Sequence, residues 1–187
     1  MTLPAASPVG RILVVDDTPF VRDIVSSLLA ARGHRIVEAD CGARALEILS
    51  HEQFDVVLLD VEMPGGIDGL QVGRSIRASA LSADVMIAMH TSLERPDVDA
   101  GFADYDDFLS KPCPASVLVP SLEELVTFRQ LDGAIADAVD LGLSRSAALG
   151  RSVQARRAAL EAYKSRLQTV IADANALYAR CRKAMGE

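Results

Sequence analysis

The sequence is poor in aromatic residues and in cysteine. Aromatics make up 4% of the 187 residues and tryptophan is absent, so the core must be mostly aliphatic, and a row of base-stacking side chains for single-stranded nucleic acid is missing. Cys41, Cys113 and Cys181 lie far apart with no C-x-x-C pair, a pattern that indicates neither a disulfide framework nor a zinc site. This cysteine usage fits a reducing compartment.

Long apolar runs and targeting signals are also missing. No segment holds about 18 unbroken apolar residues, the length that a membrane-spanning helix needs. The first residues, MTLPAASPVGRILVVDD, lack the basic region of a signal peptide, and their apolar run breaks at two aspartates. We therefore expect a cytoplasmic protein with no membrane association.

Charge is distributed unevenly along the chain. Residues 1–129 carry 10 Lys and Arg against 20 Asp and Glu, whereas residues 130–187 carry 9 against 6. Such asymmetry can reflect an acidic head and a basic tail with separate partners, although solvated helix faces give the same count more often.

Short apolar runs alternate with stretches of helical spacing. One such stretch places Phe20, Ile24 and Leu28 at helical intervals, and the runs are rich in Val, Ile and Leu rather than alternating with polar residues. Strands that are apolar on both faces suit a parallel sheet between two helical layers. The sequence therefore predicts an α/β fold, a doubly wound five-stranded sheet, for which we take the usual strand order 2-1-3-4-5. The predicted strands are 11–15, 35–39, 55–59, 84–89 and 106–109.

Turn and cap residues mark where these elements begin and end. Asp17 or Thr18 can cap a helix with Pro19 in its first turn, and Gly33 can close that helix. The run MPGGIDG at 63–69 is predicted to be a loop because of its glycines and proline.

From Ser121 onward only helical periodicity is present. A break at 141–150 predicts one helix of about twenty residues followed by a longer one. The expected organisation is a disordered lead at 1–9, an α/β domain at 10–128 and a helical extension at 129–187, either a hairpin or a coiled coil. The longer helix carries a weak heptad seam at Leu160, Tyr163, Leu167, Val170, Ala174, Leu177, Cys181 and Ala184.

Three acids fall at the carboxyl ends of predicted neighbouring strands, where parallel sheets bind ligands. Asp16 and Asp17 follow the first strand and Asp60 follows the third. Crowded carboxylates repel one another, and a hard divalent cation offsets that repulsion. Mg²⁺ uses one or two carboxylates and commonly bridges to phosphate oxygens. The cluster therefore predicts a Mg²⁺ site that receives a phosphoryl group.

Asp60 is the candidate nucleophile, since it stands alone at its strand end while Asp16 and Asp17 form a metal-holding pair. Lys111 and Thr91 follow the fifth and fourth predicted strands and can stabilise the charge on the phosphoryl oxygens. Each feature alone is common in turns and caps. Their ordered occurrence at four strand ends favours the functional interpretation.

The segments RILVVDD, FDVVLLDVEMPGGIDGL, HTS at 90–92 and DDFLSKP resemble the signature segments of the two-component receiver domain. The resemblance implies that a histidine kinase or phosphotransfer protein donates a phosphoryl group to Asp60. It also implies that Asp17, Asp60 and the backbone carbonyl of Glu62 bind Mg²⁺, and that Lys111 contacts the phosphoryl group.

The family resemblance further implies a switch in which a hydroxyl on strand four moves toward the phosphate and an aromatic on strand five turns inward. Thr91 and Phe108 match those positions, and we prefer Thr91 over its neighbour His90 because a hydroxyl donates without charge. His34 and His51 are predicted to be surface or loop residues.

Three functions compete for the extension. Dimerisation or docking of a downstream protein ranks first. DNA binding through a loose helix-turn-helix match at 135–153 ranks second. Catalysis ranks a distant third, because residues 130–187 contain no histidine and no GxxxxGK loop. We therefore expect no enzymatic activity beyond the chain's own phosphoryl uptake and loss.

Overall fold

The computed structural model describes residues 9–64 and 66–142. Five parallel strands form one sheet in the order β2-β1-β3-β4-β5, which confirms the predicted α/β fold and strand order. Parallel neighbours need crossover connections, and a helix supplies each one. The strands are β1 (Arg11–Val15), β2 (Arg35–Ala39), β3 (Val56–Leu59), β4 (Met86–Thr91) and β5 (Asp107–Ser110).

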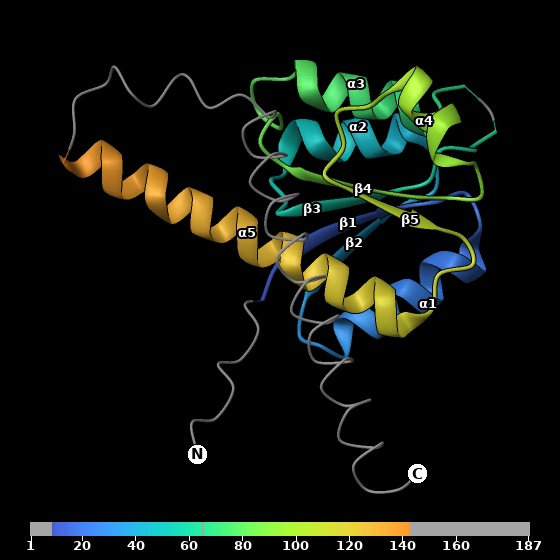
Figure 1. Cartoon of the computed structure of the whole chain (residues 1–187), viewed down its shortest axis with the longest axis horizontal. Helices are drawn as coiled ribbons and strands as arrows, with labels where there is room; N and C mark the ends of the chain where they lie inside the picture. Colours follow the sequence, from blue (N-terminus) through green and yellow to red (C-terminus); the bar gives the residue numbers. More distant parts are fainter. Residues whose placement is uncertain (1–8, 65, 143–187) are drawn as a thin grey trace, which may run out of the picture. The chain divides into compact units, whose positions relative to one another are not determined.

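Helices cover both faces of the sheet. Helices α1 and α5 lie on one face, and α2, α3 and α4 lie on the other (Figure 1). The central strands are therefore shielded from water on both sides, and every residue of β3 and β4 is buried. The helices are α1 (Pro19–Ala30), α2 (Gly42–His51), α3 (Gly69–Ala78), α4 (Arg95–Gly101) and α5 (Ala115–Gly142).

Local signals set the ends of the helices beside the sheet. Thr18 is the N-cap residue of α1 and Pro19 its first residue, but the Thr18 side chain makes no capping bond. The Asp16 carboxylate instead accepts a hydrogen bond from the Thr18 backbone N–H at 2.9 Å. After α1, Gly33 adopts a φ of 91°, which a side chain would disfavour. The predicted stop at Gly33 thus has a conformational basis.

Helix α3 begins inside the segment predicted as a loop. Asp68 and Gln71 form a reciprocal capping box, so that Gly69 is already the first residue of the helix. The predicted loop at 63–69 is therefore one residue too long at its end.

Three predicted boundaries are wrong by more than one residue. Strand β4 begins at Met86 rather than at 84. Strand β4 ends at Thr91 rather than at 89, because His90 and Thr91 pair in register with Leu109 and Ser110 of β5. Helix α5 begins at Ala115 rather than Ser121 and contains Pro120. An interior proline removes one helical hydrogen bond, and the buried leucines on either side of it, Leu118 and Leu122, hold the helix against the sheet.

The burial of two predicted features also differs. Phe20 and Ile24 show helical spacing but are 71% and 44% exposed, while Val25 and Leu29 of the same helix lie in the core. His34 was expected at the surface but is buried, because its Nδ1 accepts a hydrogen bond from the Gly10 N–H at 3.1 Å. His51 is exposed at the end of α2, as expected.

In the described part of the chain, no helix has the length and apolar character to cross a membrane. The predicted domain boundary at 128 falls within α5, which continues to Gly142. The predicted lead up to residue 8, most of the break at 141–150 and of the helix-turn-helix at 135–153, and the heptad seam lie outside the described residues.

Candidate functional site

The structure brings the three predicted acids together at the carboxyl ends of β1 and β3. These strands are direct neighbours, and each of Asp16, Asp17 and Asp60 offers a carboxylate oxygen within 4.8 Å of the others. Asp16 and Asp60 are buried, while Asp17 is half-buried. The cluster therefore presents hard oxygen donors at the edge of the sheet.

The backbone around Asp60 fixes its carboxylate. Its Oδ1 accepts hydrogen bonds from the N–H groups of Val61 at 2.7 Å and Glu62 at 3.4 Å. Gly69 packs so closely behind the site that a Cβ there would stand 1.9 Å from the Asp60 carbonyl oxygen. Only glycine allows this approach, so the first residue of α3 has a role in positioning Asp60.

Lys111 joins the cluster from the loop after β5. Its ammonium lies 2.7 Å from Asp16 Oδ2 and 2.9 Å from Asp60 Oδ2. Residues 95 positions apart in the sequence thus meet at one point. The predicted association of Lys111 with the acids is present in the geometry.

Burial and the ion pair between Asp60 and Lys111 shift the pKa of each of these two side chains in opposite directions. Burial raises the pKa of Asp60, and the nearby Asp16 carboxylate adds to the rise, whereas Lys111 opposes it. Burial by itself lowers the pKa of Lys111, but its hydrogen bonds to Asp16 and Asp60 outweigh that effect and leave the pKa raised. One ammonium faces three carboxylates, and this excess of negative charge fits a divalent cation of the hardness of Mg²⁺.

The predicted switch residues lie on neighbouring strands. Thr91 is fully buried, and its hydroxyl oxygen accepts a hydrogen bond from the Leu93 N–H at 3.3 Å. Phe108 is half-buried, with its ring centroid 6.0 Å from that of Tyr105. Thr91 lies on β4 and Phe108 on β5, the two strands that follow β3 in the sheet. The roles assigned to Thr91 and Phe108 stay predictions.

His90 occupies a different environment from Thr91. It lines a hollow together with Lys111, and burial followed by the Lys111 charge lowers its pKa to about 4. A neutral imidazole therefore faces this hollow at physiological pH.

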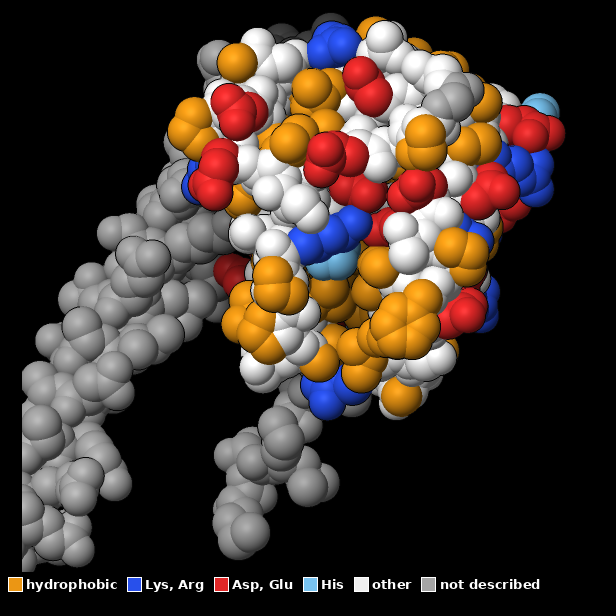
Figure 2. Space-filling model, turned by 90° about the vertical axis from the view of Figure 1, so that its right-hand side faces the viewer, with side chains coloured by type: hydrophobic (Ala, Val, Ile, Leu, Met, Phe, Trp, Pro, Cys, Tyr) orange, Lys and Arg blue, Asp and Glu red, His pale blue; other side chains and the backbone are white. Residues whose placement is uncertain are grey.

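The hollow has a cavity volume of about 430 Å³ and lies between α1 and the start of α5. Its walls are mainly apolar and include the exposed Ile24, and the exposed Phe20 lies one turn earlier on the same helix. Figure 2 shows a face of the molecule on which acidic side chains gather above a depression, and hydrophobic groups form the rim of that depression. The sequence pattern missed the hollow because Ile24 is spaced like a core residue. The lining includes Val21, Ile24, Val25, Leu28, His90 and Lys111.

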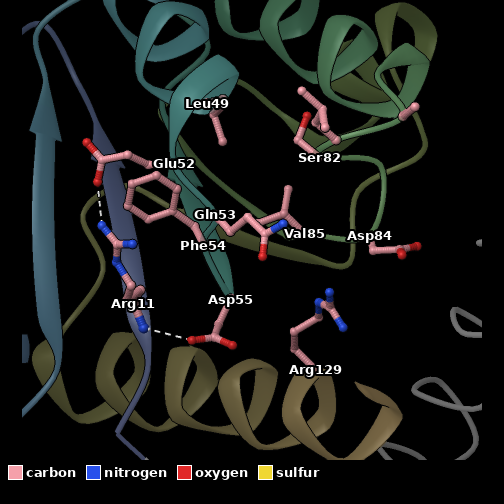
Figure 3. Close-up of a pocket in the computed structure, with 12 residues that line it drawn as sticks. Arg11, Leu49, Glu52, Gln53, Phe54, Asp55, Ser82, Asp84, Val85 and Arg129 are labelled. Carbon is pink, nitrogen blue, oxygen red and sulfur yellow. Dashed lines mark hydrogen bonds and ion pairs between the residues drawn. The ribbon is translucent and has the colours of Figure 1, made fainter. Parts of the chain in front are cut away.

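A second hollow, of about 470 Å³, lies at the opposite ends of the strands. Arg11, Phe54, Asp55 and Arg129 are among its lining residues, and Figure 3 shows their side chains around it. No site residue was predicted there.

Comparison with known proteins decides the family. The model of the response regulator receiver domain matches residues 12–123, which is more than half of the chain. The chain belongs to the response regulator receiver family. Among curated relatives of the receiver domain, the response regulator MprA of Mycobacterium ulcerans is 36% identical over 138 residues, which are 72% of this chain and 58% of MprA. The transcriptional activator protein PfeR of Pseudomonas aeruginosa is 31% identical over 67% of this chain and 40% of PfeR.

Solved receiver structures agree with the fold. The chemotaxis protein CheY4 of Vibrio cholerae has a TM-score of 0.59 at 26% identity, covering 63% of this chain and 99% of CheY4. The response regulator TrrA of Thermotoga maritima, solved in complex with Mg²⁺ and BeF, has a TM-score of 0.55 at 33% identity, covering 62% of this chain and 97% of TrrA. The chain thus spans nearly all of these single receiver domains, but only about half of the curated relatives.

Proposed function

We propose that this receiver domain accepts a phosphoryl group on Asp60 from a histidine kinase or a phosphotransfer protein, and so acts as a phosphorylation-activated response regulator. The observation that carries the proposal is the bridge from Lys111 to both Asp16 and Asp60 within a cluster of three carboxylates. A half-buried lysine there matches the charge that a phosphoryl group develops during transfer.

Transfer needs one bond to form and one to break. An Asp60 carboxylate oxygen attacks the phosphorus atom, the bond from phosphorus to the donor's histidine nitrogen breaks, and its electron pair returns to the imidazole, which takes up a proton. The hydrogen bonds from Val61 and Glu62 to Asp60 Oδ1 leave the other oxygen, Oδ2, toward Lys111. Oδ2 is therefore the attacking atom.

The remaining residues bind and orient. Asp16, Asp17 and Asp60, with the Glu62 backbone carbonyl, would hold Mg²⁺, which when bound neutralises charge on the phosphoryl oxygens. Lys111 exchanges its bond to Asp60 for one to the phosphoryl group. Thr91 turns its hydroxyl from Leu93 toward the new phosphate, and Phe108 moves into the space that is released. The chemistry of the chain is limited to its own phosphoryl uptake and loss.

Substitution of the acceptor tests this function. Asp60→Asn should abolish labelling by acetyl phosphate with Mg²⁺, because an amide cannot form the acyl phosphate. Asp23→Asn is the matched control, since Asp23 is an exposed acid on α1, and it should label like wild type. Retention of label by Asp60→Asn would show that another residue is the acceptor.

The apolar edge of the hollow supports a protein donor. Ile24 lines the hollow together with Lys111, and Phe20 is exposed one turn earlier on the same helix. A helical donor can bury such surface while presenting its histidine to Asp60. The double variant Phe20→Ala and Ile24→Ala should slow transfer from a phosphorylated histidine phosphotransfer protein. Its uptake from acetyl phosphate should be unchanged, since that small donor needs no docking surface.

We also propose that the C-terminal extension mediates dimerisation or docking of a downstream protein. The basic charge of residues 130–187, which follow an acidic receiver in the sequence, and the heptad seam at 160–184 support this function. DNA binding through 135–153 is the alternative. A truncation after Gly142 keeps α5 whole, so light scattering on the full chain and on this truncation, with and without beryllofluoride, tests assembly. A monomer in every condition would contradict the dimer.

A further inference from the structure

A cationic side chain covers the aromatic residues beside β5. The guanidinium carbon of Arg95 lies 5.7 Å from the ring centroid of Tyr105 and 5.9 Å from that of Phe108. Both distances are within the range of cation–π attraction. Arg95 is the first residue of α4, so one side chain ties the start of this helix to the predicted switch aromatic.

Several bonds keep Arg95 in this position. Its Nε donates a hydrogen bond to the Tyr105 hydroxyl oxygen at 3.0 Å, and the Tyr105 hydroxyl donates in turn to Asp99. Arg95 Nε also lies 4.0 Å from Asp99 Oδ2, one turn along α4. Pro96 follows Arg95 within the first turn and restricts the backbone there. The guanidinium is therefore oriented over the rings by its neighbours.

Phe108 and Thr91 share one face of the sheet. Met89 pairs with Phe108 and Thr91 pairs with Ser110 in the parallel register, and side chains two positions apart on a strand point to the same side. A ring that moves toward the space beside Thr91 therefore travels along this face and leaves the place where Arg95 now contacts it. The contact between Arg95 and Phe108 belongs to the state in which Thr91 is bonded to Leu93.

We propose that Arg95 is a lid on Phe108 that opposes the receiver switch. Its contact with the ring sets the fraction of molecules that are in the switched state before phosphorylation. This inference rests on the proposed function, because it takes Asp60 as the acceptor and Phe108 as the moving aromatic. The Arg95 side chain is half-exposed, so its attraction for the ring is modest, and the lid tunes the equilibrium rather than locking it.

Linkage gives the lid a measurable consequence. A contact made only in the unswitched state weakens every ligand that prefers the switched state, and removing the contact strengthens that ligand by the same factor. Arg95→Ala in the full chain should bind beryllofluoride, at saturating Mg²⁺, about two- to fivefold more tightly than wild type. Isothermal titration calorimetry measures this affinity.

Two controls separate the lid from a general effect of charge. Arg74→Ala removes an arginine that bonds to the Gly101 carbonyl of α4 and is exposed, and it should leave the affinity unchanged. In a Phe108→Leu background, Arg95→Ala should have no effect, because Tyr105 remains under Arg95 but the ring whose movement Arg95 opposes is gone. Without ligand, Arg95→Ala should also shift the Phe108 ring resonances toward those of the beryllofluoride-bound wild type.

The outcomes are distinguishable. An unchanged or weaker affinity in Arg95→Ala, with folding verified by circular dichroism, overturns the lid. An equal gain in the Phe108→Leu background assigns the effect to charge and also overturns it. Wild type that fails to bind beryllofluoride, or Asp60→Asn that binds it equally well, contradicts the proposed function and the lid together.

Discussion

The two ends of the parallel sheet differ in how well their charged side chains are paired with side chains of opposite charge. At the carboxyl ends, carboxylate oxygens of Asp16, Asp17 and Asp60 lie within 4.8 Å of one another, and Lys111 pairs with Asp16 and Asp60. At the amino ends, charges are matched, as in the pair of Arg77 with Asp106 at 2.7 Å. Unmatched charge costs stability and is retained where a ligand is to bind, whereas matched charge supports the fold.

Arg77 shows how complete the matching is at the amino ends. Besides Asp106, its guanidinium donates hydrogen bonds to the backbone carbonyls of Ala83, Val85 and Asp104. Asp106 is buried and also accepts the Ile87 N–H at 2.8 Å. The network joins α3 to the segments that enter β4 and β5, and it uses nearly all the donors of one arginine.

The largest expected effect is the loss of this network. Arg77→Ala leaves Asp106 as a buried charge without its partner and removes the donors of three carbonyls, so the free energy of unfolding should fall by about 3–5 kcal/mol. Urea unfolding followed by circular dichroism measures the loss. The Mg²⁺ affinity of the folded fraction should be unchanged, because the network lies at the other end of the strands. A loss below about 1 kcal/mol would show that the two ends do not differ in this way.

At the carboxyl ends, Mg²⁺ should remove the cost of crowding. A ligand that binds only the folded chain stabilises it by about 2.7 kcal/mol at one hundred times its Kd. Wild type should therefore gain about that much free energy of unfolding in saturating Mg²⁺ over EDTA, and Asp60→Asn should gain less. Equal gains in both proteins would mean that the ion binds elsewhere.

The pH dependence in EDTA follows from the raised pKa of Asp60. A carboxylate whose folded pKa is above its ordinary value of 3.8 stabilises the fold at low pH, and this contribution is lost as pH rises through the folded pKa. The stability of wild type relative to Asp60→Asn should therefore fall from about pH 3.8 upward. Asp23→Asn should follow wild type throughout, since Asp23 is exposed.

A smaller effect is expected from Gly69, the glycine behind Asp60. Gly69→Ala places a methyl group 1.9 Å from the Asp60 carbonyl oxygen, which forces the backbone to move and should cost about 1–3 kcal/mol of stability. Mg²⁺ affinity should fall as well, because Asp60 moves with its backbone. Gly73→Ala is the matched control, since its Cβ would meet the Phe102 ring at 2.6 Å. That variant should lose stability but keep its Mg²⁺ affinity.

Sequence patterns predicted the carboxyl ends well for a physical reason. The apolar runs fix where each strand ends, and parallel order then brings the terminal residues to one edge, so Asp16, Asp17, Asp60 and Lys111 could be grouped without coordinates. The same logic misplaced the end of β4, because the polar pair of His90 and Thr91 is buried there.

Features that depend on distant partners could not be predicted. The burial of His34 requires the N–H of Gly10, 24 residues away, and the Arg77 network joins groups up to 29 residues apart. Helix α1 carries apolar residues on more than one side, so spacing did not reveal that Ile24 is exposed while Val25 is buried. Periodicity defines a face, and only packing decides which face is covered.

The smallest expected effect comes from an exposed pair at the amino ends. Arg11 is bonded to Glu52 and its guanidinium lies 5.0 Å from the Phe54 ring centroid (Figure 3). Both contacts are partly solvated, so Arg11→Met should cost only about 0.2–1 kcal/mol, and the cost should shrink in high salt.

Arg11→Lys separates the two contributions, since lysine keeps the charge but loses the planar stacking on Phe54. A cost for Arg11→Lys near zero assigns the pair to simple charge attraction, and a cost equal to that of Arg11→Met assigns it to stacking. A loss of 3 kcal/mol or more for Arg11→Met would equal that expected for Arg77. Burial would then not be what distinguishes the strong ion pair at this end of the sheet from the weak one.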